Sequence, residues 1–228
     1  MTMAPTFPLS DPRAVSAAAD ALVSGWIVAL PTDTVYGLAV DPTQPEAVAA
    51  LFGLKERPAD VALPILVGSR HQVEQVAAQL ELAASQLADR FWPGPLTLVV
   101  PRRSVFVVDL GGPPSARLTV GVRWPDHPLV AELCARIGPL AVTSANRHGQ
   151  PPATTAAQVA GVFPHAEDLK VIIDGGTCDG VPSTVLECRG PASRGLREGA
   201  IPFEAIFELR RPGATDGTLR DRSTATGG

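Results

Sequence analysis

Six short segments of the sequence carry polar side chains that could bind a small anionic ligand. Each stands where a predicted strand or helix begins or ends, and they are PTDTVYGL (31–38), KERP (55–58), RWP (123–125), TSAN (143–146), PSTV (182–185) and REG (197–199). Hydroxyl, amide and backbone N–H groups can bind a nucleobase, ribose or phosphate, and Lys and Arg bind phosphate oxygens. Because open α/β sheets bind ligands at strand ends, these segments predict a nucleotide site assembled from separate loops.

Two of the segments also have a purely structural interpretation. A turn rich in Thr and Asp, such as residues 31–38, often satisfies its own backbone groups. Lys55 and Arg57 stand at the end of a predicted helix, where cations complement the helix dipole. However, Lys55 is one of two lysines in a chain with seventeen arginines, and a compact charge at this position favours the phosphate interpretation.

Several common catalytic motifs are missing from the sequence. It contains no G-x-x-x-x-G-K-[ST], no G-x-G-x-x-G after a predicted strand and no G-x-S-x-G. Cys134, Cys178 and Cys188 form no C-x-x-C pair, and no histidine stands near them at the spacing of a metal ligand. We therefore expect reduced thiols and no metal site made by the protein itself.

The elements that must position the six segments alternate between strands and helices. Helices are predicted at 14–23, 46–54 and 127–137, with one or two more within 72–90. Short apolar runs predict strands at 26–30, 63–67, 96–100, 119–123, 140–143, 171–174 and 184–187. Because the last strands follow one another closely, we expect an α/β fold with a mixed sheet that includes antiparallel pairs.

Length and composition predict one domain. The chain has 228 residues, 45% hydrophobic and 18% charged, which is ordinary for a globular protein with a sizeable core. Residues 1–209 should form this domain, 210–228 a disordered tail and 104–116 a mobile loop. No apolar run approaches the roughly 18–20 residues that cross a bilayer, and the first residues lack a signal-peptide pattern, so we expect a cytoplasmic protein with no membrane partner.

In this order, the six segments resemble the YrdC-type domain family of threonylcarbamoyl-AMP synthases. The resemblance runs from about residue 11 to residue 209, and the order of the motifs makes it specific. It implies that residues 1–209 are a YrdC-like catalytic domain of the short form, without the extra C-terminal domain of longer members. The implied fold is a twisted α/β sheet with helices around a deep, positively lined cavity.

The resemblance also implies an enzyme, an ATP-dependent nucleotidyltransferase. L-threonine, bicarbonate or CO2, and ATP would give L-threonylcarbamoyladenylate and pyrophosphate, for the threonylcarbamoyladenosine modification at position 37 of tRNA. Mg²⁺ would arrive with ATP, bound mainly through the phosphates. A downstream tRNA threonylcarbamoyl transferase would take the product, and direct tRNA binding stays open.

The resemblance assigns roles to ten residues of this sequence. Threonine would be bound by Thr34, Tyr36, Arg123 and Ser183, with Arg123 pairing its carboxylate. ATP would be bound by Lys55, Arg57, Ser144, Asn146, Thr154 and Arg197, of which Lys55 and Arg57 would act on the phosphates as catalytic residues. Such a set has no nucleophile, so catalysis would consist of holding two anions together and neutralising their charge.

The sequence departs from the family at two places. Val61 and Ala62 follow KERP where the family has a polar or basic residue and then proline, and Leu66 stands where some relatives have histidine.

Two other functions fit the sequence less well. A non-catalytic RNA-binding or ribosome-assembly factor disagrees with the net charge of −4 and the eleven aromatic residues. A carbamoyl-transfer module for metallocentre maturation would sit in a longer chain with zinc-finger-like cysteines.

Overall fold

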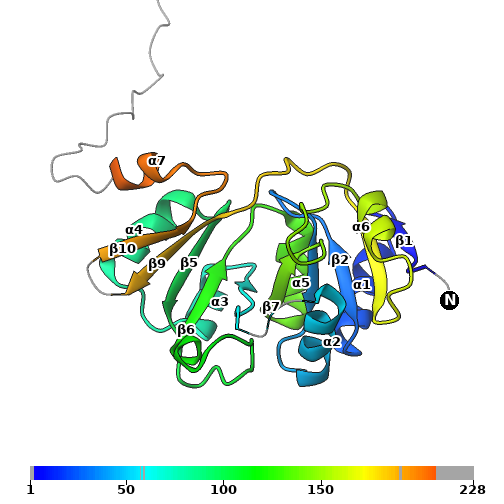
Figure 1. Ribbon diagram of the computed structural model, residues 1–228, viewed down its shortest axis with the longest axis horizontal. Coiled ribbons are helices and arrows are strands. Elements are labelled where there is room, and N and C mark those ends of the chain that lie inside the picture. The colour runs from blue at the N-terminus through cyan, green and yellow to red at the C-terminus, as the bar shows by residue number, and fades with distance from the viewer. Residues whose placement is uncertain (1–2, 57, 59, 190–191, 209–228) are drawn as a thin grey trace, which may run out of the picture.

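A ten-stranded mixed sheet organises the chain, as the alternation of strands and helices predicts (Figure 1). The computed structural model describes residues 3–56, 58, 60–189 and 192–208. The strands are β1 (Thr6–Pro8), β2 (Ile27–Leu30), β3 (Gly37–Val40), β4 (Ile65–Leu66), β5 (Leu96–Pro101), β6 (Thr119–Arg123), β7 (Leu140–Ser144), β8 (Leu169–Asp174), β9 (Thr184–Arg189) and β10 (Ala192–Arg197). Their order across the sheet is β1-β8-β2-β3-β7-β4-β6-β5-β9-β10.

Seven helices pack against this sheet in the described part of the chain, and around β2 they cover both of its faces. They are α1 (Ala14–Val23), α2 (Pro45–Lys55), α3 (Arg70–Val76), α4 (Leu82–Phe91), α5 (Pro128–Ile137), α6 (Ala156–Val162) and α7 (Phe203–Glu208). Buried side chains of α1 and α5 pack with one face of β2, including Val28 and Leu30, whereas α2 and α6 pack with the other face, including Ile27 and Ala29. With both faces covered, all four residues of β2 are buried, which explains its unbroken apolar run.

The pairing of the strands brings the polar segments together. In the antiparallel pair of β2 and β3, Leu30 lies opposite Gly37, so residues 31–36 form the connection at one end of the sheet. Gly37 in turn lies opposite Ser144, the last residue of β7. Farther along the sheet, the parallel pair of β5 and β9 places Leu96 opposite Thr184. Strand ends from distant parts of the sequence therefore meet at one place.

Several elements were not predicted from the sequence. They are β1, β3, β10, α6 and α7. Residues 31–38 were expected to be a polar turn, but β3 begins within them at Gly37. The strand expected at 63–67 is reduced to Ile65–Leu66. The loop expected at 104–116 contains the start of a 3₁₀ helix, Pro114–Leu118, and its Leu110 is buried.

Two expectations fall on residues that the structure does not describe. The disordered tail at 210–228 lies outside the described residues, and so does Arg57. None of the helices in the described part of the chain is long and apolar enough to cross a membrane.

Candidate active site

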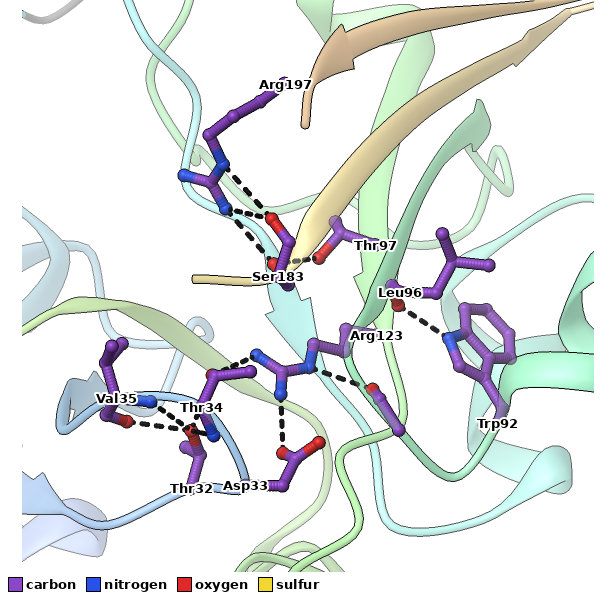
Figure 2. A network of polar contacts seen from close by, with 11 residues as sticks. Thr32, Asp33, Thr34, Val35, Trp92, Leu96, Thr97, Arg123, Ser183 and Arg197 are labelled. Atoms are coloured by element: carbon purple, nitrogen blue, oxygen red, sulfur yellow. Dashed lines mark hydrogen bonds and ion pairs between the residues drawn. The ribbon is translucent and has the colours of Figure 1, made fainter. Parts of the chain in front are cut away.

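Arg123 is a buried cation with three hydrogen-bond acceptors around it. It ends β6, and its side chain is 7% exposed. Its Nε donates to the Gly94 carbonyl at 3.1 Å, Nη1 donates to Thr34 Oγ1 at 2.9 Å, and Nη2 pairs with Asp33 Oδ1 at 2.5 Å (Figure 2). Burial lowers the pKa of Arg123, while Asp33 opposes that effect, and a guanidinium stays charged in proteins. Described residues accept from three of its five N–H groups and leave two for a ligand.

The neighbouring threonine hydroxyls belong to one hydrogen-bonded turn. Thr32 Oγ1 donates its proton to the Val35 carbonyl at 2.7 Å and accepts from the backbone N–H groups of Thr34 and Val35 at 3.1 and 3.3 Å. Thr32 Oγ1 and Thr34 Oγ1 are 3.0 Å apart. Because Arg123 occupies one lone pair of Thr34 Oγ1, the other is free to accept a hydrogen bond. Thr34 can therefore accept a hydrogen bond from a ligand ammonium or hydroxyl group.

A second cation, Arg197, stands at the end of β10 and contacts Ser183. Its Nε and Nη2 donate to the Ser183 carbonyl at 3.1 and 2.8 Å, and Nη2 also reaches Ser183 Oγ at 3.1 Å (Figure 2). Ser183 Oγ is also 2.9 Å from Thr97 Oγ1 on β5. Burial lowers the pKa of Arg197. Since Nη1 has no hydrogen bond to a described residue, the outer edge of this guanidinium can bind an anion.

Gly199 allows the segment after Arg197 to approach Ser183 closely. A Cβ atom at Gly199 would lie 2.2 Å from the Pro182 carbonyl oxygen and 2.6 Å from the Ser183 carbonyl carbon. The Thr184 hydroxyl fastens the same segment, since it accepts from Gly199 N at 3.0 Å and donates to the Ile201 carbonyl at 2.6 Å. The glycine of the REG segment is thus explained by backbone contact.

Lys55 connects the end of α2 to the turn after β7. Its side chain is buried, and Nζ donates to the Asn146 carbonyl at 2.7 Å, to Asn146 Oδ1 at 3.2 Å and to the Ser144 carbonyl. The Ser144 hydroxyl donates to Asn146 Oδ1 at 2.6 Å. Lys55 thereby fixes the turn that carries two of the predicted ATP-binding side chains.

Two other predicted residues have structural contacts. The Tyr36 hydroxyl accepts from Gly175 N at 3.1 Å and donates to the Gly176 carbonyl at 2.8 Å, which holds the connection between β8 and β9. Burial raises the pKa of Tyr36, so the phenol stays protonated at neutral pH. The Thr154 hydroxyl donates to Gln158 Oε1 at 3.0 Å, at the start of α6.

Two adjoining cavities lie among these groups. The first has a volume of about 180 Å³ and is lined by Thr32, Thr34, Val35, Tyr36, Gly37, Pro64, Leu66, Thr97, Arg123, Val142, Thr143, Ser144, Pro152, Pro182, Ser183 and Arg197. The second, of about 420 Å³, shares Pro64, Thr97, Ser183 and Arg197 with it and extends over β5, β6 and β9. Apolar side chains such as Val99, Val120 and Val185 line the second cavity. The four shared residues make the two cavities parts of one candidate site.

The two cavities differ in charge. The first is lined by Arg123 and Arg197 and has no acidic lining residue among those described. The second contains Asp60 and Glu187 as well as Arg189 and Arg197. The positively lined cavity that the family resemblance implies is therefore positive at one end, whereas its other end has both acidic and basic lining residues. Nowhere in the described chain do three or more His, Cys, Asp or Glu side chains form a group that could hold a metal ion.

Six of the ten predicted site residues line the first cavity: Thr34, Tyr36, Arg123, Ser144, Ser183 and Arg197. Lys55 and Asn146 lie behind Ser144, whereas Thr154 does not line either cavity. Of the departures from the family pattern, Leu66 lines the first cavity, and Val61 and Ala62 line the second. These positions describe geometry, and the ligand roles remain predictions.

Sequence reasoning missed three polar residues of the site: Thr32, Asp33 and Thr97. Thr97 had a visible signal, because it is the single polar residue in the apolar run LTLVV. Thr32 and Asp33 stand inside the PTDTVYGL segment, where nothing local distinguishes a residue that orients Arg123 from one that satisfies the turn.

Comparisons with known proteins identify the family of this chain. The family model for Sua5, YciO and YrdC proteins, described as "telomere recombination", matches residues 20–199. A relative from Mycobacterium tuberculosis is 37% identical over 212 residues, which are 91% of this chain and 95% of the relative. The threonylcarbamoyl-AMP synthase of Pyrococcus abyssi is 40% identical over 218 residues, which are 92% of this chain and 62% of that protein.

A solved structure gives the same result in three dimensions. The crystal structure of P. abyssi Sua5 complexed with L-threonine is 38% identical, with a TM-score of 0.81, and the match covers 91% of this chain. This chain spans 61% of that protein's length. From the family model, the full-length relative and the shared fold, we conclude that the chain belongs to the Sua5/YciO/YrdC family.

Proposed function

We propose that this protein is an L-threonylcarbamoyladenylate synthase, a nucleotidyltransferase that uses L-threonine, bicarbonate or CO2, and ATP. The single observation that carries the proposal is the first cavity, where the free N–H groups of Arg123 and the acceptor face of Thr34 lie side by side. The names of relatives support the proposal, because the P. abyssi protein that is 40% identical to this chain is named threonylcarbamoyl-AMP synthase.

Threonine suits the first cavity because its polar groups complement those of the protein. Its carboxylate would accept from the two remaining N–H groups of Arg123, as a guanidinium fork prefers. Its ammonium or hydroxyl group would donate to Thr34 Oγ1, which has a free lone pair. Ser183, which also lines this cavity, would make a second hydrogen bond to the substrate through its Oγ.

ATP suits the region where the two cavities join. Arg197 lines both cavities, and its Nη1 would bind the phosphates, together with Arg57 and the turn at Ser144 and Asn146. The apolar walls of the second cavity would accept the base. We assign Lys55 a double role, to fix the Ser144 turn and to add positive charge behind the phosphates.

The proposed chemistry follows from this arrangement. The deprotonated amine of threonine adds to CO2 and forms a carbamate. One carbamate oxygen then attacks the α-phosphorus of ATP, and the bond to the β-phosphate oxygen breaks to release pyrophosphate. The protein would contribute positioning and charge neutralisation by Arg123, Arg197 and Lys55. Mg²⁺ carried by the phosphates would supply further positive charge.

Pyrophosphate release tests the proposed function directly. Four reactions are compared: complete, without threonine, without bicarbonate and without ATP. We expect pyrophosphate in the complete reaction alone. Pyrophosphate release that does not depend on threonine would contradict the proposal. If none of the four reactions releases pyrophosphate, the RNA-binding alternative is tested next by titrating RNA at increasing salt concentrations.

The use of the product is also part of this proposal. Threonylcarbamoyladenylate is an activated acyl donor, and it would supply a separate transferase that forms threonylcarbamoyladenosine at position 37 of tRNA. We place this reaction in the cytoplasm, where ATP, threonine and tRNA are available. Mass spectrometry of tRNA from cells that lack this protein should show loss of the modified nucleoside.

A further inference from the structure

Thr97 has a buried hydroxyl group that its strand does not require. The residue lies on β5, within the apolar run LTLVV, and is 6% exposed. Valine has nearly the same shape and a similar preference for strands, and it occupies positions 99 and 100 of the same strand. A buried hydroxyl group costs free energy unless it makes hydrogen bonds. The choice of threonine at this position therefore points to a polar partner.

The partner of Thr97 is Ser183. In the parallel pair of β5 and β9, Leu96 lies opposite Thr184 and Thr97 opposite Val185, which brings the residue before β9 next to Thr97. The two side-chain oxygens, Thr97 Oγ1 and Ser183 Oγ, are 2.9 Å apart (Figure 2). Both residues line both cavities, so this hydroxyl pair stands where the two cavities join.

The hydroxyl pair carries one proton more than its mutual hydrogen bond uses. Either oxygen can donate to the other, but only one proton lies between them. Among the described residues, Ser183 Oγ has one other partner, Arg197 Nη2 at 3.1 Å, which is itself a donor, and Thr97 Oγ1 has no other partner. The second hydroxyl proton thus has no acceptor in the described part of the chain. Because both side chains line the first cavity, this proton is available to a ligand there.

The charge of the first cavity favours one direction for the hydrogen bond within the pair. Arg123 and Arg197 line this cavity, with no acidic lining residue among those described, so its ligand is expected to be an anion that accepts hydrogen bonds. If Thr97 donates to Ser183, the two lone pairs of Ser183 Oγ are filled by Thr97 and Arg197, and its proton is left for the anion. The opposite direction would turn a lone pair of Ser183 toward the anion. A chain of hydrogen bonds that ends on a charged acceptor also strengthens each of its members.

We propose that Thr97 is a positioning residue that donates to Ser183 Oγ and thereby makes the Ser183 hydroxyl a donor for a negatively charged oxygen of the substrate. This inference rests on the proposed function, because it assumes that threonine or its carbamate occupies the first cavity. Thr34 offers an acceptor in the same cavity. The two sides of the substrate would thus be distinguished, with an amine or hydroxyl group at Thr34 and a carboxylate or carbamate oxygen at Ser183.

A double-mutant cycle tests this proposal. The variants are T97V, S183A and T97V/S183A, with T97S as the conservative variant that keeps the hydroxyl group. T6V serves as the matched control, because Thr6 is an exposed strand residue on β1, at one edge of the sheet, and lines neither cavity. For each protein, kcat and the KM values for threonine and ATP are measured by pyrophosphate release, and thermal unfolding is recorded.

We expect T97V to raise the threonine KM about threefold to tenfold. The ATP KM should change less than about twofold, because Arg197 keeps both of its hydrogen bonds to the Ser183 carbonyl. T97S should stay within about twofold of the wild type, and T6V should match it. The double variant should be no worse than S183A, since residues that act through one another give non-additive effects. A merely structural role of Thr97 would not produce a selective change in the threonine KM.

Calorimetric titration of threonine in carbonate-free buffer distinguishes the two possible oxygens. Weaker binding to T97V than to the wild type would assign the Ser183 contact to the carboxylate of threonine. Equal binding, together with a raised threonine KM in the complete reaction, would assign it to the carbamate, which forms only when CO2 is present. Either result agrees with the proposed role of Thr97.

Other outcomes overturn the inference. Additive effects of T97V and S183A would mean that Thr97 acts independently of Ser183, and equal changes in both KM values would mean that it supports the site as a whole. A threonine KM of T97V like that of the wild type would show that Ser183 needs no such partner. If T97V fails to fold, T97A is compared with T97S, since the two differ only in the hydroxyl group, and equal KM values would contradict the proposal. Failure of the proposed function is seen separately, as a wild type without threonine-dependent pyrophosphate release.

Discussion

Arg123 shows how individual residues prepare this site before a ligand arrives. Gly94, Thr34 and Asp33 each take one of its N–H groups, which fixes the guanidinium in the wall of the first cavity. A side chain held in this way loses little conformational freedom when it binds, so more of the interaction appears as affinity. Arginine is required here because a lysine ammonium cannot satisfy three fixed acceptors and also offer a planar fork.

Replacement of Arg123 by alanine should therefore act mainly on threonine. We expect the threonine KM to rise about 30-fold to 100-fold, equivalent to about 2–3 kcal/mol for a charged hydrogen-bonded pair. The ATP KM should change much less. Steady-state kinetics of R123A and R123K give the measurement, and R123K should recover only part of the loss. Equal effects on both substrates would remove Arg123 from the threonine site.

Lys55 makes a prediction of a different kind, because its ammonium group fixes protein carbonyls. In K55M, the carbonyl groups of Ser144 and Asn146 would lose a charged donor inside the protein. We expect the free energy of unfolding to fall by about 1–3 kcal/mol in a urea titration, together with lower turnover. As control, Lys170, which stacks over the exposed Trp26 ring, can be replaced by methionine with a smaller effect. Full stability of K55M would show that these contacts are unimportant.

Short connections between the strands, rather than the helices, fix the positions of several site residues. The segment after β10 lies against the start of β9 at Gly199, and the two are joined by the Thr184 hydroxyl. G199A would place a methyl group 2.2 Å from a backbone oxygen, so one of the two segments must move. Since Ser183 and Arg197 belong to these segments, we expect lower activity with both substrates and a lower melting temperature.

The matched control for G199A is G161A. Gly161 lies in α6, and a Cβ atom there would meet nothing within 4 Å. Alanine is favoured over glycine in a helix by roughly 0.5–1 kcal/mol, so G161A should be as stable as the wild type or more so. Differential scanning calorimetry of both variants tests the pair. If G199A melts like G161A, the close approach at Gly199 has no structural importance.

The elements also show which features the sequence could predict. Buried strands such as β2, β5 and β8 were found from their short apolar runs, and the run of β2 is unbroken because helices cover both of its faces. By contrast, β3 was missed because its four residues, GLAV, follow directly on a polar motif and include glycine. β10 contains two arginines and a serine, a pattern typical of a solvent-facing edge strand, which carries no apolar signal.

For the candidate site, the motifs predicted which residues lie together but not which hydrogen bonds they make. Sequence order placed Thr34, Arg123, Ser183 and Arg197 in one site, and they line one cavity. Their hydrogen-bond partners could not be predicted, because the contacts of Arg123 with Asp33 and of Arg197 with Ser183 depend on strand register and side-chain rotamers. Such details arise from tertiary packing, which a local pattern does not contain.

A buried thiol affects how the free energy of unfolding of the whole protein depends on pH. Cys134 on α5 is fully buried, and burial raises the pKa of its thiol from 9.0 to about 12. In the unfolded chain the thiol ionises near its ordinary pKa, so above about pH 9 the unfolded state binds fewer protons than the folded state. The free energy of unfolding should therefore fall as pH rises, by at most about 1.4 kcal/mol per pH unit from this group.

Urea titrations of the wild type and C134A at pH 8 and pH 10.5 measure this effect. The variant should be less stable at pH 8, because a buried sulfur atom is lost. Its stability should nevertheless decline less steeply with pH than that of the wild type. Tyr36, whose pKa is also raised by burial, is present in both proteins and cancels in the comparison. Parallel declines would contradict the shifted pKa of Cys134.

The position of β8 in the sheet has a consequence for how the protein is made. β8 lies between β1 and β2, so Thr6 near the start of the chain pairs with Ile172, 166 residues later. During synthesis on the ribosome, β1 has no strand to pair with until most of the chain has emerged. Such long-range pairing slows folding, and the nascent N-terminal half exposes apolar strand edges for much of translation. Cells that make this protein quickly should therefore depend on chaperones to protect it.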